Sequence, residues 1–349
     1  MEKKIRIAFV LKSSIYSGAE NVAISIIKGL ENRYEFLYIA TQGEIEDKLL
    51  EREVPYHLLK KFSLSNLENA LKSYKPDIVH AHDFSATVYC AAFQKRYRYK
   101  LVSHLHYDPP WAEKWNLRTA LYYLTSKRVS KLIAVTKASY KNMIFSDALA
   151  GKTVCINNPI DAVKIRKMAE VEEKEEYDLL FVGRLVVQKN PESFIRIAKN
   201  INQCSHDIKC AMVGEGELKI ECQKMIEEYG MQDQIRLLGY QKNPYRYMKH
   251  SRVVCMTSRW EGFGLVAAEA NTLGVPVLST RTAGVTEVLG ENAEELCVDE
   301  SEMTAKIKCL LDSSECYEKY KNAAIERSKN FVSTIQYLNC IENVYHEIV

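Results

Sequence analysis

The feature that most constrains the fold is an alternation of short apolar runs with longer amphipathic stretches, which the chain shows in both halves. Runs such as "IRIAFVL", "DIVHAH" and "KLIAVT" in the first half, and "DLLFVGR", "DIKCAMVG" and "RVVCMTS" in the second, are each followed by a helical pattern. Nearly apolar strands separated by helices indicate parallel sheets that are covered on both faces. The chain therefore predicts an α/β fold with two doubly wound, Rossmann-like domains.

The acidic run "KMAEVEEKEEY" (167–177) interrupts this alternation and predicts a solvated linker or a linking helix. We expect an N-terminal domain over 1–162, a linker over 163–177 and a C-terminal domain over 178–328. A last helix within 329–349 is expected to cross back to the N-terminal domain. A chain of 349 residues suits two domains. Two such sheets facing each other would hold ligands in a cleft between the carboxyl ends of their strands.

Composition excludes several classes of protein. Because the net charge is only +3, nucleic acid is not an expected partner. The ten cysteines contain no C-x-x-C pair, which is typical of a reduced, cytoplasmic chain. No run approaches the roughly 18 apolar residues that a membrane-spanning helix needs. Any membrane contact would therefore be peripheral, at the inner face.

The stretch "EGFGLVAAEA" (261–270) follows a predicted strand and opens a predicted helix. Glu261 is expected in the loop and Glu269 on the second turn of the helix. Gly262 and Gly264 allow backbone amides to approach a ligand, and a helix N-terminus favours an anion. A carboxylate one turn further along suits hydroxyl donors such as those of a sugar or ribose. The alternative is a loop with two salt-bridged glutamates, and the pattern alone favours neither.

The stretch "FVGRLVVQKN" (181–190) supplies positive charge after another strand. A guanidinium at Arg184 and an ammonium at Lys189 together suit a diphosphate. Solvated surface charges are the alternative. Asn190 is expected to cap a helix whose first residue is Pro191.

In the first half, "SIYSGAEN" (14–21) places Gly18 at the start of a helix, where backbone approaches a phosphate. Neither this stretch nor "VGEGEL" (213–218) is a complete G-x-G-x-x-G, so a nicotinamide-dinucleotide site loses support.

Histidines form two pairs, His80 with His82 and His104 with His106, each pair on one face of a strand end. They could ligate a metal, and a metal-dependent hydrolase is therefore a rival function. Structural or substrate-facing histidines are favoured over a metal site, because no other type of ligand accompanies the pairs.

Several stretches together resemble the family-4 retaining glycosyltransferases of the GT-B fold: "SGAENVA", "PDIVHAHD", "GRLVVQKN", "MVGEGEL" and "WEGFGLVAAEANTLGVPVLST". Glu261 and Glu269 match the E-x(7)-E motif of that family. The resemblance implies a hexosyltransferase that moves a sugar from a nucleoside-diphosphate sugar to a glycan or lipid-linked acceptor, in bacterial surface or exopolysaccharide biosynthesis.

Carried over by position, the resemblance implies roles for individual residues. Gly18 would approach the donor phosphates or sugar, and His106 would face the transferred sugar. Arg184 and Lys189 would neutralise the diphosphate, and Glu269 would bind the ribose. The sugar and phosphates would be held by Glu261 with Gly262, Phe263, Gly264 and Leu265, and the base pocket would be bordered by Leu238, Gly239 and Tyr240.

The catalytic set implied by the resemblance is His106, Arg184, Lys189 and Glu261. No two aspartates have D-x-D spacing, so neither a metal nor another cofactor is expected. The chain departs from the family pattern at Ser17-Gly18, at 158–161 and at 283–286, which bears on the donor sugar and the acceptor. A nucleotide-sugar 2-epimerase of the same fold and a non-catalytic nucleotide-sugar-binding subunit are alternatives.

The segment "WAEKWNLRTALYYLTSKRVSK" (111–131) follows a double proline. On one continuous helix it would present a stripe of Trp111, Trp115, Tyr122 and Val129, beside Lys114, Arg118 and Arg128. With the basic stretch "QKRYRYK" (94–100), it predicts peripheral membrane contact through residues 94–131. Packing of the stripe against the domain core is the alternative, and it is the commoner use of such a pattern.

Overall fold

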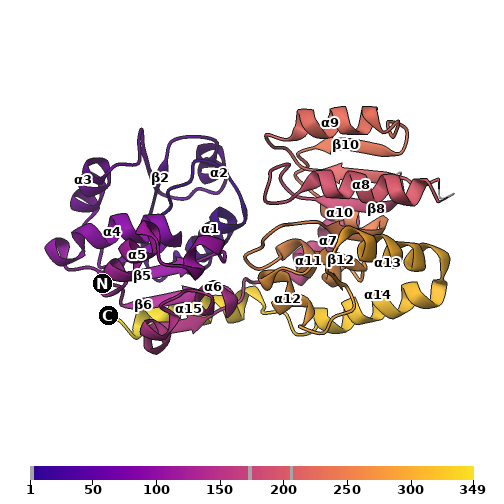
Figure 1. Cartoon of the computed structure of the whole chain (residues 1–349). Helices are drawn as coiled ribbons and strands as arrows, with labels where there is room; N and C mark the ends of the chain where they lie inside the picture. Colours follow the sequence, from indigo (N-terminus) through magenta and orange to yellow (C-terminus); the bar gives the residue numbers. More distant parts are fainter. Residues whose placement is uncertain (1–3, 172–174, 205–206) are drawn as a thin grey trace. The chain divides into compact units, whose positions relative to one another are not determined.

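The computed structural model describes residues 4–171, 175–204 and 207–349, and the chain divides into two compact units (Figure 1). The first unit is Met1–Pro159 together with Thr334–Val349, and the second is Ile160–Ser333. Each unit has its own sheet and its own core.

The first unit is a parallel sheet with the strand order β3-β2-β1-β4-β5-β6-β7. The order reverses between β1 and β4, which is where ligands of doubly wound sheets bind. Its strands are β1 (Arg6–Val10), β2 (Glu35–Thr41), β3 (Tyr56–Leu59), β4 (Ile78–His82), β5 (Lys100–Leu105), β6 (Lys131–Ala134) and β7 (Thr153–Cys155). Its helices are α1 (Gly18–Leu30), α2 (Ile45–Glu51), α3 (Leu64–Tyr74), α4 (Asp83–Tyr97), α5 (Leu117–Ser126), α6 (Ala138–Lys141) and α15 (Thr334–His346), with 3-10 turns at Pro110–Glu113, Ser146–Ala148 and Ala150–Lys152.

The second unit is also a parallel sheet, with the strand order β10-β9-β8-β11-β12-β13 and its reversal between β8 and β11. Its strands are β8 (Tyr177–Val182), β9 (Cys210–Val213), β10 (Ile235–Gly239), β11 (Ser251–Met256), β12 (Val277–Thr280) and β13 (Leu296–Cys297). Its helices are α7 (Ala162–Ala169), α8 (Pro191–Asn202), α9 (Lys219–Glu228), α10 (Tyr245–Lys249), α11 (Leu265–Thr272), α12 (Ala283–Leu289), α13 (Glu300–Asp312) and α14 (Ser314–Ser328). The predicted pair of doubly wound α/β folds is confirmed.

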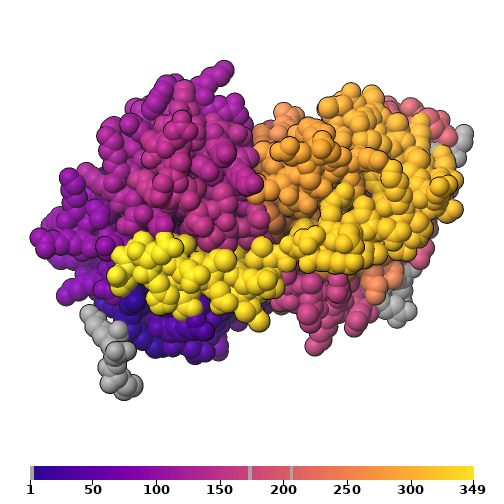
Figure 2. Space-filling model, turned by 90° about the horizontal axis from the view of Figure 1, so that it is seen from below, coloured from indigo at the N-terminus to yellow at the C-terminus, as the bar shows by residue number. Residues whose placement is uncertain are grey.

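The C-terminal helix α15 belongs to the first unit although the second unit precedes it in sequence. Figure 2 shows it in yellow against the indigo and magenta segments of that unit. It packs against α1, where a β-carbon added at Gly29 would meet Leu338. Its inner face is buried and consists of Tyr337, Ile341, Val344 and Tyr345. The helix is therefore part of the core of the first unit.

The expectation of one helix across 111–131 is wrong. A 3-10 turn ends at Glu113, and α5 begins anew at Leu117. The cause is Asn116, whose side-chain oxygen accepts hydrogen bonds from the amides of Arg118 and Thr119 at 2.9 and 3.1 Å. Such a cap begins a new helix, so the residues before it do not share a helix face with those after it. Tyr122 and Val129, two members of the predicted stripe, are buried in the core.

Part of the expected linker is helical, since α7 occupies Ala162–Ala169 within the second unit. Residues 172–174 of that linker lie outside the described residues. In the described part of the chain, no helix combines the length and the apolar character needed to cross a membrane.

We expect Ile341→Ala to lower the free energy of unfolding of the first unit by about 2–5 kcal/mol, because it leaves a cavity under α15. Ile341 is fully buried, whereas Ile335 on the same helix is 74% exposed. Ile335→Ala is the matched control and should change stability by no more than about 0.5 kcal/mol. Urea unfolding monitored by fluorescence measures both, and equal effects of the two variants would contradict the packing of α15.

Candidate active site

In the second unit, two loops carry six of the thirteen predicted site residues, and both follow strands at the reversal point of the sheet. Arg184 and Lys189 lie in the loop after β8, and Glu261 lies in the loop after β11. β8 and β11 are hydrogen-bonded neighbours, with Val253 opposite Leu179. The carboxyl ends of adjacent parallel strands meet at one edge, so the predicted residues are brought together.

An ion pair joins the two loops. The Lys189 ammonium lies 2.5 Å from Glu261 Oε1, and the Ser258 hydroxyl donates to the same oxygen at 2.6 Å. Glu261 is only 6% exposed. A buried carboxylate requires such partners, because an unpaired charge away from water is strongly unfavourable.

Further hydrogen bonds hold the same loops together. The Gln188 amide group donates to the Trp260 carbonyl oxygen at 3.1 Å, and the Arg259 backbone amide donates to the Gln188 carbonyl oxygen at 2.8 Å. The Arg184 guanidinium, by contrast, is exposed, 3.5 Å from the Gln188 side-chain oxygen. No carboxylate in the described part of the chain pairs with Arg184, so its charge is available to an anion.

Asn190 precedes α8, and Pro191 is the first helical residue, as predicted. The side chain of Asn190 nevertheless makes no capping hydrogen bond, and its φ is +50°. Asparagine tolerates this left-handed conformation better than most residues. Asparagine therefore suits this position because of the tight turn and not because it caps the helix.

Glycines set the shape of the loop that contains Glu261. Gly264 has a φ of +86° and directly precedes α11, and a β-carbon there would lie 2.8 Å from Val285 Cγ2. Gly284 lies so close to the loop that its β-carbon would be 2.5 Å from the Gly262 carbonyl oxygen. No sequence pattern marked Gly284 as a site residue. Its place in the site follows only from its packing against Gly262, which lies 22 residues earlier in the chain.

Glu269 lies on α11, one element beyond Glu261, and is partly exposed. Burial raises the pKa of its carboxyl to about 7, while a hydrogen bond from the Tyr245 hydroxyl and the charge of Lys189 act in the opposite direction. The Tyr245 hydroxyl donates to Glu269 Oε1 at 3.1 Å. Tyr245 is a contact that no sequence pattern indicated.

The predicted border of the base pocket lies at the end of β10. Gly239 has a φ of +65°, and its carbonyl oxygen accepts from the Gly214 amide at 2.8 Å. Gly214 in turn approaches the loop after β8 so closely that its β-carbon would overlap the Gly183 carbonyl oxygen. Leu238 is partly buried, whereas Tyr240 is exposed.

The other two predicted residues, Gly18 and His106, lie in the first unit. Gly18 is the first residue of α1, just after Ser17, whose amide and hydroxyl both donate to the buried Glu20 carboxylate, at 3.0 and 2.5 Å. His106 directly follows β5. The S-x-x-E spacing of Ser17 and Glu20 is a known signal for a helix start, and it could have identified Glu20.

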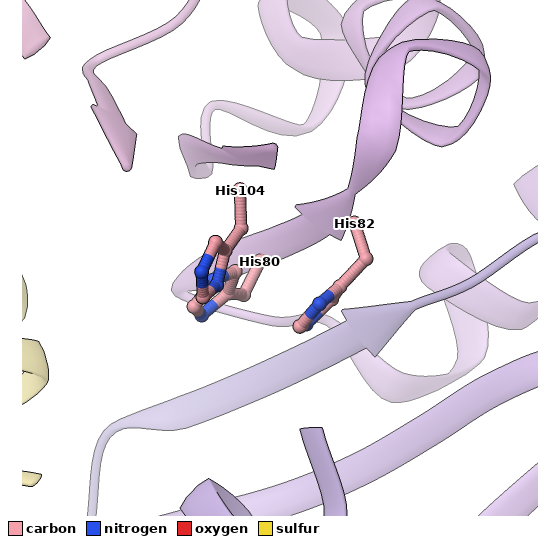
Figure 3. Close-up of side chains that lie close together, drawn as sticks. All are labelled: His80, His82 and His104. Atoms are coloured by element: carbon pink, nitrogen blue, oxygen red, sulfur yellow. The ribbon is translucent and has the colours of Figure 1, made fainter. Parts of the chain in front are cut away.

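Four histidines form a stacked array at the ends of β4 and β5, and Figure 3 shows three of them. His82 Nδ1 lies 2.7 Å from His106 Nε2, and His80 Nε2 lies 3.1 Å from His104 Nδ1. The other ring nitrogen of His80 lies 2.7 Å from the hydroxyl of Tyr345, on the C-terminal helix. The array is therefore a hydrogen-bonded network that includes α15.

Burial keeps these imidazoles neutral. It lowers the pKa of both His80 and His106 to about 3, and it holds the pKa of His82 and His104 well below the usual range. The ring nitrogens of His80, His82 and His104 lie within 4.8 Å of one another, a spacing from which three ligands could reach one metal ion. Both nitrogens of His80 are already hydrogen-bonded, and all three rings are buried. A hydrolytic metal centre needs an open position for water, which this packing does not favour.

Asp83 connects the array to the backbone. Its Oδ1 accepts from the His106 amide at 2.9 Å, and burial raises its pKa to about 7. Asp83 has a φ of +65°, at the junction of β4 and α4. A left-handed residue other than glycine is uncommon and marks a constrained position. An aspartate directly after a buried strand, in "HAHD", was the signal that could have found it.

Comparison with known proteins identifies the family of the chain. Residues 16–164 match the model described as "Glycosyltransferase Family 4", and residues 164–327 match "Glycosyl transferases group 1". A relative from Erwinia amylovora, the amylovoran biosynthesis glycosyltransferase AmsD, is 25% identical over 331 residues, covering 90% of this chain and 92% of the relative.

A second relative, from Campylobacter jejuni, is an N-acetylgalactosamine-N,N'-diacetylbacillosaminyl-diphospho-undecaprenol 4-alpha-N-acetylgalactosaminyltransferase. It is 28% identical over 218 residues, which cover 60% of this chain and 59% of the relative. Among solved structures, Anabaena HepE in complex with UDP-glucose is similar with a TM-score of 0.84 at 22% identity, covering 98% of this chain and all of the other. The family models, the relatives and the fold agree, and the chain belongs to the family-4 glycosyltransferases of the GT-B fold.

Proposed function

We propose that this glycosyltransferase moves a hexosyl group, with retention of configuration and without a metal ion, from a nucleoside-diphosphate sugar to a growing bacterial surface polysaccharide. The observation that carries the proposal is the pairing of Lys189 with Glu261 beside the exposed Arg184, at the reversal point of the second sheet. This arrangement offers two cations to a diphosphate and one carboxylate to a sugar.

The leaving group of such a reaction is a nucleoside diphosphate, so stabilising its developing charge is the main catalytic requirement. Arg184 and Lys189 would contact the phosphates, and amides at the start of α11 would add fixed partial charge. The hydrogen bonds to Glu261 from Lys189 and Ser258 use the same oxygen, Oε1. We propose that Oε2 accepts hydroxyls of the sugar, while Glu269 accepts hydroxyls of the ribose. UDP-glucose, bound by HepE, is the first donor to test.

His106 would orient the sugar and not act as a general base. A pKa of about 3 keeps the imidazole neutral at physiological pH, and a group so weakly basic accepts a proton poorly. Its hydrogen bond with His82 fixes the ring. In a retaining transfer by attack on the same face, the departing diphosphate accepts the acceptor's proton, and no protein nucleophile is required.

The acceptor is proposed to be a glycan carried by a lipid diphosphate at the cytoplasmic face of the membrane. The relative from Campylobacter jejuni is named for an undecaprenol-linked acceptor, and AmsD is named for biosynthesis of a polysaccharide. A 2-epimerase would use the same donor groups without an acceptor, and a non-catalytic subunit would not need to retain Arg184, Lys189 and Glu269 together. The family matches favour transfer over these alternatives and over the hydrolase.

Arg184→Ala should lower kcat/KM for the donor by about 100- to 1,000-fold, because one partner of the diphosphate is lost. His106→Ala should lower kcat while leaving the Kd of the nucleoside diphosphate unchanged. The matched control is Arg236→Ala, another exposed arginine of the second unit, whose surface ion pair with Glu175 contributes little. Steady-state kinetics and calorimetric titration with UDP measure these effects; an unchanged kcat/KM in Arg184→Ala would refute the diphosphate contact.

Glu269 predicts a pH dependence of nucleotide binding. With a pKa of about 7 in the free protein, the carboxylate fraction increases through neutrality, and only the carboxylate is a strong acceptor for ribose hydroxyls. UDP affinity should therefore rise about tenfold more between pH 6 and pH 8 in the wild type than in Glu269→Gln. The comparison cancels titration of the UDP phosphate, which is the same for both proteins. Parallel pH profiles would contradict ribose binding by Glu269.

Metal independence has a direct test. Transfer from the donor should continue in excess EDTA at a rate within about twofold of the untreated enzyme, because Arg184, Lys189 and backbone amides supply the charge stabilisation. The matched control is the calcium complex of EDTA, which changes ionic strength equally. Loss of activity in EDTA, with recovery on adding a divalent cation, would overturn the metal-free mechanism.

A further inference from the structure

Helix α5 exposes leucines on the face opposite to the one it buries. Leu117, Leu121 and Leu124 are 84%, 45% and 59% exposed, and Trp115 just before the helix is 56% exposed. Spacings of four and three residues place the three leucines on one face. The three leucines are called here the α5 apolar face.

The orientation of the helix is fixed, so these leucines cannot turn into the core. Its other face is buried through Thr119, Tyr122 and Ser126. The Tyr122 hydroxyl lies 2.9 Å from the Ser103 hydroxyl on β5, and the Asn116 cap sets the first turn. The Trp115 ring packs against Tyr123, with centroids 5.7 Å apart. A helix that is held firmly on one face and exposes leucines on the other presents the exposed face to a partner.

Positive charge surrounds the α5 apolar face. Arg118 and Lys127 are exposed, and on the helical wheel they fall on either side of the leucines. Residues 95–141 contain eleven lysines and arginines and only two acidic residues, whereas the whole chain has 48 basic and 45 acidic residues. The remainder of the chain is therefore net acidic, and the positive charge is concentrated in the segment that contains this helix. An anionic partner is the one that suits it.

We propose that the α5 apolar face docks the enzyme on an anionic phospholipid bilayer, with the leucines in the interfacial region and Arg118 and Lys127 against lipid phosphates. An apolar stripe flanked by basic residues is the pattern of an interfacial helix. The proposal rests on the proposed function, because a lipid-carried acceptor makes membrane docking useful. It differs from the sequence-based stripe, since Tyr122 and Val129 are core residues and the leucines replace them.

The experiment is co-sedimentation of the full chain with vesicles of phosphatidylcholine alone or with 30% phosphatidylglycerol. The wild type should bind the anionic vesicles, more weakly at high salt. The triple variant Leu117→Asn, Leu121→Asn, Leu124→Asn should lose at least tenfold in partitioning, and Arg118→Glu with Lys127→Glu should lose the preference for anionic lipid. The matched control changes three exposed isoleucines on other helices, Ile220, Ile325 and Ile335, to Asn and should bind like the wild type.

Failure of docking and failure of the proposed function are separable. The far-UV circular dichroism and the UDP binding of the triple variant should equal those of the wild type, which shows that it is folded and that the donor site is intact. Equal vesicle binding by wild type and triple variant would overturn the proposal. A wild-type dimer in sedimentation velocity that the triple variant abolishes would overturn it in favour of a second copy. Vesicle binding without sugar transfer would overturn only the proposed function.

Discussion

The ion pair between Lys189 and Glu261 is the interaction on which the candidate donor site depends. It connects the loop after β8 to the loop after β11, and these strands are adjacent where the sheet order reverses. A carboxylate that is 6% exposed needs such a partner, so each loop fixes the other. The close backbone approach of Gly284 to Gly262 makes the same connection without charge. The two loops are thus held together by contacts within the chain itself.

The parts of this site that the sequence predicted are those determined by local pattern. Apolar runs between helical stretches predicted both sheets, and the positions of Arg184, Lys189, Glu261 and Glu269 relative to strand ends placed them on the correct loops and helix. Tyr245, Ser258 and Gly284 were missed, because their contacts depend on how elements pack and not on spacing. The position of Asn190 before α8 was predicted correctly, but its role as a cap was not. Asparagine is favoured both at helix caps and in the left-handed conformation, and the sequence does not distinguish the two.

The segment 111–131 shows where periodicity fails. A helical wheel assumes one uninterrupted helix, and a single side chain, Asn116, invalidates it by capping a new helix five residues in. A stripe that assumes one helix therefore combines residues that face different ways. Tyr122 and Val129 lie in the core, and Trp115 lies on the surface. The composition of the segment was informative even so, because basic residues and exposed apolar residues do coincide there. The composition of a segment does not depend on where a helix begins, whereas the assignment of its residues to one helix face does.

The histidine array and the donor site place opposite electrostatic demands on the protein, and each unit meets one of them. In the first unit, burial removes charge: the four imidazoles are held neutral, and Tyr345 from the C-terminal helix provides the second hydrogen bond of His80. In the second unit, charge is retained, with one buried ion pair and one exposed guanidinium. Under the proposed transfer, fixed positive charge would stabilise a leaving diphosphate, and neutral imidazoles would not oppose positive charge that develops on the sugar. Packing α15 into the first unit thus contributes to the array directly, because it adds the hydroxyl that lets His80 stay buried with both ring nitrogens hydrogen-bonded.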